Sequence, residues 1–293
     1  MTSGSLSTTG EQARGQSSAR RTSWSGPAVL FLPAALFLLV FFIVPLLSVV
    51  WMSFTDPAPG LGNYIKFFSS AYDLGVLLNT FRTSAIVTVL SLLVAYPVAY
   101  VAARYGGALG AILLLVVTLS FWTSFLVRTY AWMVILGVKG PVVAVLGWFG
   151  WTPAPQILFT SFASTFAMTH LLVPFMVLTL YSVMKRIDPS YMRAASSLGA
   201  TPFRAFLSVY LPLSAPGIAN GAILIFITCL GFYVTPVLLG SPRDKMIAGV
   251  IGDEIEQMLN FGNASAMAII LLIVTLAIFL LYTRFFGLDK LWR

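Results

Sequence analysis

Few polar side chains of this chain stand where they could do chemistry, and those few lie within long apolar runs. His170 falls near the middle of one run, and Arg128 lies at the end of another. An ionisable group inside a membrane is a functional candidate, although a histidine bonded to a neighbouring helix or an arginine that anchors an interface fits equally well. A single histidine cannot build a zinc protease site. The chain also lacks a Gly-x-Ser-x-Gly elbow and a phosphate loop ending in Gly-Lys-Ser/Thr, so we expect no enzyme activity, bound metal or cofactor, or ATP site of its own.

The composition places these residues in a membrane. Of 293 residues, 59% are hydrophobic and only 9% are charged, which is too little charge for a soluble domain of this size. Six apolar runs each exceed the roughly 20 residues that a helix needs to cross a bilayer. They cover residues 28–51, 78–103, 109–136, 159–184, 217–239 and 264–286. We therefore predict an all-α membrane protein with six transmembrane helices. The single Cys229 excludes a disulfide framework and is expected to be a small core residue.

The distribution of charge predicts the orientation. With the N-terminus inside, the inner segments hold eleven of the 17 basic residues and three of the nine acidic ones, which leaves six of each on the outer side. The positive-inside rule then places both termini in the cytoplasm. The basic excess is a topology signal and a contact with anionic lipid, so we expect no nucleic-acid partner. The predicted divisions are a disordered cytoplasmic tail over 1–26, a six-helix transmembrane domain over 27–287 with a cytoplasmic hairpin at 185–213, and a short cytoplasmic tail over 288–293.

The fifth apolar run carries an interruption, Gly231-Phe232-Tyr233-Val234-Thr235-Pro236. Pro236 cannot donate to the helix ladder, and its ring disfavours helical backbone at the preceding residue. Broken backbone at membrane depth survives only where protein or a water-filled cavity covers it. This pattern predicts either a packing kink or the lining of a transport path. The candidate path residues are Trp122, Arg128, His170, Phe232 and Tyr233.

The most informative polar segment lies between two apolar runs and reads DPSYMRAASSLGATPFRAFLSVYLP over residues 188–212. Asp188-Pro189 and Thr201-Pro202 each pair a capping residue with a proline that suits the first helical position. Gly199 stands where the first helix must stop. We predict two short helices joined by a turn. Two apolar faces follow from the helical period, a small one at Tyr191, Ala194, Ala195 and Leu198 and a larger one at Phe203, Phe206, Leu207 and Tyr210.

This hairpin closely resembles the loop that defines the permease subunits of binding-protein-dependent ABC importers, the type I or EAA-loop family. The family pattern is Glu-Ala-Ala, three residues, Gly, nine residues, Ile, one residue and Leu-Pro. The same spacing holds here for Arg193-Ala194-Ala195, Gly199, Val209 and Leu211-Pro212. Arg193 replaces the family glutamate, so no role is carried over to that side chain. The runs LVRTY at 126–130, LLVPFMVLTLYS at 171–182 and GFYVTPVLLG at 231–240 are similar to the spermidine/putrescine branch, and the resemblance extends over 28–286.

The resemblance implies a type I importer permease fold in a bacterial inner membrane. It also implies an ABC ATPase dimer that binds ATP and Mg²⁺, a second permease subunit that favours a paralogous heterodimer, and a periplasmic solute-binding protein. The hairpin would dock in a cleft of the ATPase and couple hydrolysis to movement of the spans. The residues that this assigns to the coupling loop are Tyr191, Arg193, Ala194, Ala195, Leu198, Gly199, Pro202, Phe203, Leu211 and Pro212.

The branch implies a polyamine or a related small amine as the solute. Aromatic side chains in the spans suit an amine, but the spans contain no carboxylate, and Arg82 and Arg128 oppose a cation. Either the binding protein holds the selectivity, or the solute is an opine, phosphonate, iron or amino-acid derivative. Two other classes stay open. An ion-coupled secondary transporter would need more ionisable groups than His170 and often an internal repeat, which is not evident here. A membrane scaffold would need the hairpin but not the interruption at 231–236.

Overall fold

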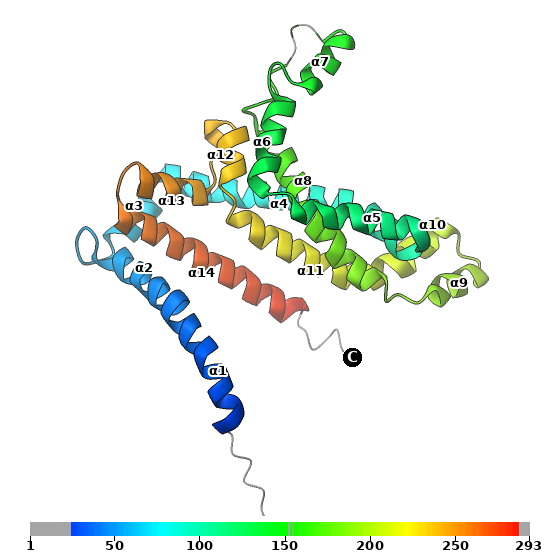
Figure 1. The fold of residues 1–293 in the computed structure, drawn as a ribbon, viewed down its shortest axis with the longest axis horizontal. Helices are drawn as coiled ribbons and strands as arrows, with labels where there is room; N and C mark the ends of the chain where they lie inside the picture. The colour runs from blue at the N-terminus through cyan, green and yellow to red at the C-terminus, as the bar shows by residue number, and fades with distance from the viewer. Residues whose placement is uncertain (1–24, 152, 154, 287–293) are drawn as a thin grey trace, which may run out of the picture. The chain divides into compact units, whose positions relative to one another are not determined.

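The computed structural model describes residues 25–151, 153 and 155–286 and divides into two compact units, Met1–Ser48 and Val49–Arg293 (Figure 1). Most of the predicted tail over 1–26 lies outside the described residues, and residues 25 and 26 already belong to the first helix. The predicted tail over 288–293 lies outside them entirely. Six helical segments are long and apolar enough to cross a membrane, as the sequence predicts: Phe31–Thr55, Ala71–Arg104, Phe125–Trp148, Ser161–Met184, Pro202–Leu230 and Phe261–Arg284.

The first unit consists of α1 (Ser25–Leu38), a π-helical turn η1 (Leu39–Ile43) and the start of α2 (Val44–Thr55). The wide turn stands directly before Pro45. A proline removes one helical hydrogen bond, and its ring crowds the carbonyl four residues earlier. The Val44 N–H instead donates to the Leu39 carbonyl five residues back, which widens the turn and lets one helix continue past the proline.

The second unit contains all the later elements, and no strand occurs in the part of the chain that the structure describes. In chain order, its first elements are α3 (Gly62–Ser69), α4 (Ala71–Arg104), α5 (Gly107–Leu119), the 3-10 turn η2 (Ser120–Trp122), α6 (Phe125–Leu136), α7 (Pro141–Trp148) and α8 (Ser161–Met184). The rest are α9 (Pro189–Ser197), α10 (Pro202–Ala205), the π-helical turn η3 (Phe206–Tyr210), α11 (Leu211–Leu230), α12 (Val234–Leu239), the 3-10 turn η4 (Pro242–Asp244), α13 (Ile247–Glu256) and α14 (Phe261–Phe286).

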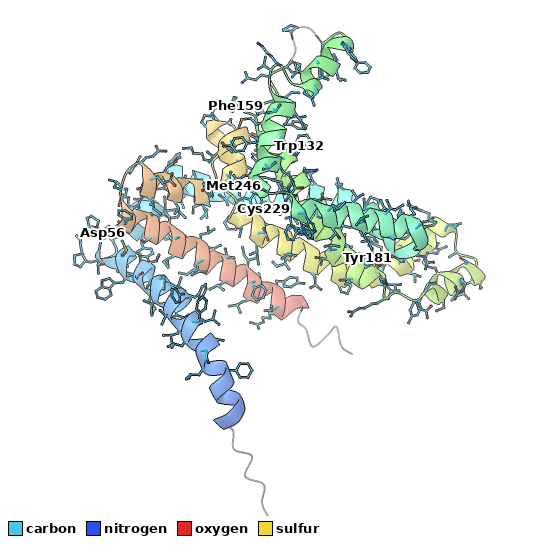
Figure 2. All side chains as sticks on the ribbon, in the orientation of Figure 1. Asp56, Trp132, Phe159, Tyr181, Cys229 and Met246 are labelled. Atoms are coloured by element: carbon cyan, nitrogen blue, oxygen red, sulfur yellow. The ribbon has the colours of Figure 1, made fainter. Side chains whose placement is uncertain are left out.

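The core of this unit lies where α4, α8 and α11 pack together. Val87 of α4, Met176 of α8 and Cys229 of α11 are fully buried there, so the prediction of Cys229 as a small core residue is confirmed. Gly221 of α11 has no room for a side chain, because a Cβ atom there would stand 2.4 Å from the Met176 sulfur. A side chain at this position would therefore require the buried Met176 side chain to move. Figure 2 shows Cys229 and Met246 at the centre of the unit.

Two predicted helix boundaries are wrong. The third apolar run, 109–136, was expected to be one helix, but it breaks at Thr123 and Ser124 into α5 with η2 and then α6. The second hairpin helix was expected to be short and separate, but α10, η3 and α11 form one continuous helix from Pro202 to Leu230. The π-helical turn η3 precedes Pro212 at the same spacing as η1 precedes Pro45, and it absorbs the proline in the same way.

The hairpin lies at the opposite end of the second unit from α3 and α13. In Figure 1, α9 and α10 stand at one end, and α3 and α13 stand at the other. At the end of α3 and α13, the Asp56 carboxylate accepts a hydrogen bond from the Gly262 N–H at 2.8 Å and ties the first loop to the start of α14. The hairpin therefore lies at the end of the second unit away from α3 and α13.

Candidate functional site

Local hydrogen bonds define the hairpin formed by α9 and α10, as predicted. The Asp188 side chain caps α9 by accepting from the Ser190 N–H at 2.7 Å, and this bond lowers the pKa of the Asp188 carboxyl. The Thr201 hydroxyl caps α10 by accepting from the Arg204 N–H. Gly199 has φ +84°, and the N–H groups of Gly199 and Ala200 donate to the carbonyls of Ser196 and Ala195. These two bonds form a Schellman motif, which requires the positive φ that glycine adopts at little cost.

The tip of the hairpin exposes large apolar side chains. Leu198 is 89% exposed and Phe203 is 72% exposed, and Tyr191 of α9 is also exposed. Among the other predicted coupling residues, Ala195 is buried and Leu211 is partly buried, whereas Arg193, Ala194, Gly199, Pro202 and Pro212 are exposed. An exposed apolar cluster on a water-side loop indicates a protein partner. The role of these residues stays a prediction.

The larger apolar face predicted for the second hairpin helix divides into two parts. Phe206 and Tyr210 turn inward, where each packs edge-to-face on Tyr100 of α4, with ring centroids 5.7 and 4.9 Å apart. Phe203 and Leu207 stay exposed. The inward pair anchors the hairpin on the bundle, and the outward pair is left for a partner. Because α10 continues into α11, a displacement of the hairpin acts directly on a membrane span.

A second candidate site lies where α6, α8 and α12 meet. The Trp132 indole N–H donates to His170 Nδ1 at 3.1 Å, and the Trp132 ring packs edge-to-face on Phe166 (Figure 2). The hydroxyls of Thr129 and Thr235 are 3.3 Å apart and join α6 to α12. We call this region the α6–α8–α12 junction. It brings together three helices that are far apart in the sequence.

Both interruptions of the spans reach this junction. Phe125 is the first residue of α6 after the break at 123–124, and Phe232 lies in the break between α11 and α12. Their rings pack edge-to-face with centroids 5.1 Å apart, so the two breaks lie side by side. The predicted interruption near Gly231–Pro236 is thus present, although Pro236 itself lies within α12. Irregular backbone at this depth needs cover from protein or water.

The structure brings some predicted path residues together and leaves others apart. Arg128 and His170 are close enough for their charges to interact, and Phe232 contacts Phe125 beside them. Trp122 is 86% exposed, and Tyr233 is also exposed. The sequence did not single out Phe125, Thr129 or Thr235. Phe125, Thr129 and Trp132 are four and three positions apart, which places them on one face of α6, but whether that face is covered depends on tertiary packing.

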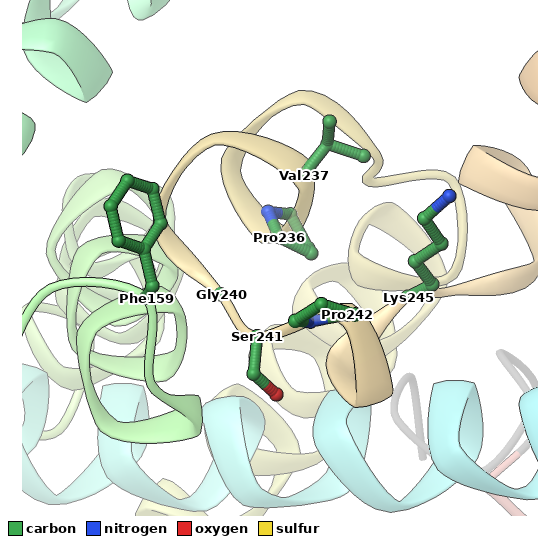
Figure 3. Close-up of a pocket in the computed structure, with 7 residues that line it drawn as sticks. All are labelled: Phe159, Pro236, Val237, Gly240, Ser241, Pro242 and Lys245. Atoms are coloured by element: carbon green, nitrogen blue, oxygen red, sulfur yellow. The ribbon is translucent and has the colours of Figure 1, made fainter.

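A cavity of about 430 Å³ opens at the far end of α12 (Figure 3). Its lining residues are Phe159, Pro236, Val237, Gly240, Ser241, Pro242 and Lys245. The ammonium of Lys245 forms an ion pair with Asp253. No carboxylate belongs to the lining, so this cavity offers a cation no direct partner. Within the described ranges, no group of three or more His, Cys, Asp or Glu side chains is placed to hold a metal ion.

Comparison with known proteins decides the family. Residues 95–288 match the family described as "binding-protein-dependent transport system inner membrane component", a range that includes the hairpin and the α6–α8–α12 junction. The chain belongs to this family. It is a multi-pass protein of the inner membrane and the permease subunit of an ABC importer. The resemblance inferred from the hairpin spacing is therefore confirmed.

Two relatives align with most of the length of this permease. The spermidine/putrescine transport system permease protein PotB of Haemophilus influenzae is 35% identical over 223 residues, which is 76% of this chain and 78% of the relative. PotB of Escherichia coli strain K12 is 31% identical, over 81% of this chain and 84% of the relative. A solved bacterial alginate ABC transporter in complex with an alginate-bound periplasmic protein matches with a TM-score of 0.72 at 21% identity, covering 89% of this chain and 95% of the other. This structural match supports the fold alone.

Proposed function

We propose that this permease carries a polyamine, spermidine or putrescine, from a periplasmic binding protein into the cytoplasm. The observation that carries the proposal is the identity of 31–35% to spermidine/putrescine permeases over about three quarters of both chains. The aromatic side chains of the α6–α8–α12 junction, Trp132, Phe166 and Phe232, are of the type that receives amines. The competing solutes are an opine, a phosphonate, iron or an amino-acid derivative.

ATP hydrolysis belongs, in this proposal, to a separate ABC ATPase dimer that binds ATP and Mg²⁺. The hairpin docks in a cleft of the ATPase through Leu198, Phe203 and Tyr191, the exposed apolar side chains of its tip. This orientation places the hairpin and both termini in the cytoplasm, in agreement with the excess of basic residues on that side. The solute-binding protein then sits on the opposite face, at the end of α3 and α13.

The continuous helix from Pro202 to Leu230 supplies the link between the two sides. It has 29 residues, which is about 44 Å at 1.5 Å per residue. One end carries the hairpin, and the other end stops at the break before α12. Closure of the ATPase moves the hairpin, the helix transmits the movement along its length, and the α6–α8–α12 junction opens or closes. A second, paralogous permease completes the path, because broken backbone at 123–124 and 231–233 needs cover within the membrane.

The test is ATP hydrolysis by the complete importer in lipid nanodiscs, with its binding protein and a panel of solutes. The proposal predicts stimulation by spermidine or putrescine and none by opines, phosphonates or iron. Stimulation by another solute would keep the importer and reject the polyamine. Failure of any ATPase to copurify with the permease would reject the role of the hairpin. The copurifying proteins, identified by mass spectrometry, also test the heterodimer, because a homodimer contains a single permease sequence.

A further inference from the structure

Contacts between the segment 121–132 and α8 give the level of Arg128 along α8. His170 stands 14 residues before Met184 and nine residues after Ser161, the two ends of α8, so it lies about 21 Å from one end and about 14 Å from the other. The rings of Phe121 and Phe175 pack together, as do those of Trp132 and Phe166, so the segment 121–132 runs antiparallel to α8. Arg128 falls between these two contacts. Its guanidinium therefore belongs to the level of His170, well inside a hydrocarbon layer of about 30 Å.

No acidic side chain balances this arginine in the part of the chain that the structure describes, where the single ion pair joins Lys245 to Asp253. The Nε atom of Arg128 is buried and has no hydrogen-bond partner. Its titratable neighbour is His170, whose Nδ1 accepts from the Trp132 indole N–H, so this nitrogen carries no proton. The other ring nitrogen of a neutral His170 is then a donor. The group thus presents positive charge and hydrogen-bond donors only.

The arginine is also held in position. Thr129, the next residue, bonds to Thr235 of α12, and Trp132, one turn later on the same helix, bonds to His170 of α8. Phe125, one turn earlier, packs on Phe232 in the break before α12. Contacts to both neighbouring helices therefore fix α6 on either side of Arg128. A charged side chain inside a membrane costs free energy, so an arginine where the two helix breaks meet is a candidate for a functional role.

We propose that Arg128 is a charge barrier to the solute, a positively charged gate that keeps polycations from crossing while the α6–α8–α12 junction is closed. The proposal rests on the proposed function, because the repelled solute is a polyamine. Repulsion grows with the charge on the solute and is strong in a medium of low dielectric constant. Movement of α12 with α11 separates the junction and withdraws the barrier. The spans of this chain thus hold a gate for polycations, and selectivity for them lies with the binding protein.

The experiment measures passive leak into proteoliposomes that contain the complete importer, with neither binding protein nor ATP. The probes are trivalent spermidine, divalent putrescine, monovalent tetraethylammonium and neutral mannitol. In Arg128→Gln we expect about a tenfold rise in spermidine leak, a smaller rise for putrescine, a still smaller one for tetraethylammonium and no change for mannitol. Arg128→Lys keeps the charge and should stay near wild type. Arg243→Gln, which makes the same change at an exposed position of η4 outside the spans, is the matched control.

The relative increases in leak for the four probes distinguish loss of a charge barrier from a damaged fold. A rise that is equal for mannitol and spermidine means a loosened bundle and overturns the barrier, as does an unchanged spermidine leak in Arg128→Gln. Loss of ATP-driven uptake without extra leak would make Arg128 a positioning residue instead. The proposed solute can fail separately: if polyamines do not stimulate the wild-type ATPase, the comparison of tetraethylammonium with mannitol still tests the barrier.

Discussion

The hairpin and the α6–α8–α12 junction are held by opposite kinds of interaction. In the hairpin, each defining bond joins residues two to five positions apart, such as Asp188 to Ser190 and Ala195 to Ala200. In the junction, Trp132 and His170 are 38 positions apart, and Thr129 and Thr235 are 106 apart. The hairpin can therefore keep its shape while it moves as a unit. The junction changes whenever one of its three helices shifts.

This difference suits the two tasks of an importer permease. A coupling element must transmit force without deforming, and short-range hydrogen bonds that belong to one segment allow this. A gate must have two arrangements separated by little energy, and a few contacts between separate helices provide it. Substitutions in the hairpin should thus affect coupling and leave the bundle intact, whereas substitutions in the junction should affect the bundle and the solute path together.

The largest effect is expected at the tip of the hairpin. Leu198→Asp places a charge where the structure exposes the most apolar surface of the hairpin. An anchor of this kind contributes about 2 kcal/mol or more to a protein interface, so we expect at least a 30-fold fall in ATPase stimulation by the loaded binding protein. The melting temperature should not change, because the side chain touches little of its own chain. Ser197→Asp, at an exposed neighbour, is the control, and full stimulation in Leu198→Asp would refute the docking surface.

A smaller effect is expected at the turn itself. Gly199→Val meets no steric obstacle, since nothing lies within 4 Å of a Cβ atom there, but it forces a branched residue to φ +84°. That backbone costs about 1–2 kcal/mol for a residue with a side chain, which corresponds to roughly a tenfold loss of the docked hairpin. Gly199→Asn should lose less, because asparagine tolerates this region. The readout is ATP-driven uptake, and equal activity of the two variants would show that the turn is not strained.

The same contrast explains what could be predicted from the sequence. The caps, the first helix and the turn of the hairpin were predicted, because capping residues, prolines and Gly199 act locally. The number of spans was predicted because hydropathy alone requires it, but the third span covers Phe125–Trp148 and not 109–136. The break at Thr123 and Ser124 was missed, since neither residue is a helix breaker and the apolar run continues across it. The break depends on tertiary packing, in which the Phe125 ring contacts the Phe232 ring of the other break.

The continuity of α10 with α11 was missed for a different reason. Pro212 is a stop signal by local rules, and the π-helical turn η3 that lets the helix pass it leaves no clear sequence pattern. The proposed barrier at Arg128 could be predicted only in part. The residue was recognised from the sequence, but its depth and its neighbours depend on how α6, α8 and α12 pack.

A moderate effect is expected from Trp132→Phe in the junction. Phenylalanine keeps an aromatic ring beside Phe166, but it removes the hydrogen bond to His170 and part of the ring packing on it. A hydrogen bond of this type contributes about 1 kcal/mol, so thermal unfolding of the purified permease should occur a few degrees lower. Hairpin docking, measured as copurification of the ATPase, should be unchanged. Trp148→Phe, at a residue that is 89% exposed on α7, controls for loss of an indole, and equal melting temperatures in the two variants would contradict the role of the bond.

The smallest effect concerns the cap of α9 and appears only in acid. The Ser190 N–H stabilises the ionised Asp188 carboxylate and lowers its pKa, so the cap is fully present above the unfolded pKa of about 4 and is lost as pH falls through the lower folded pKa. Hydrogen exchange at the Ser190 amide should therefore be protected at pH 5 and should lose protection below pH 4, beyond the intrinsic pH dependence of exchange. Asp188→Asn also caps helices but cannot titrate, so its protection should stay flat. A parallel loss of protection in both proteins would place the acid sensitivity elsewhere in the bundle. A loss in wild type alone means that one local bond, from the Ser190 N–H to the Asp188 carboxylate, sets the acid stability of the hairpin, whereas the junction depends on contacts between separate helices.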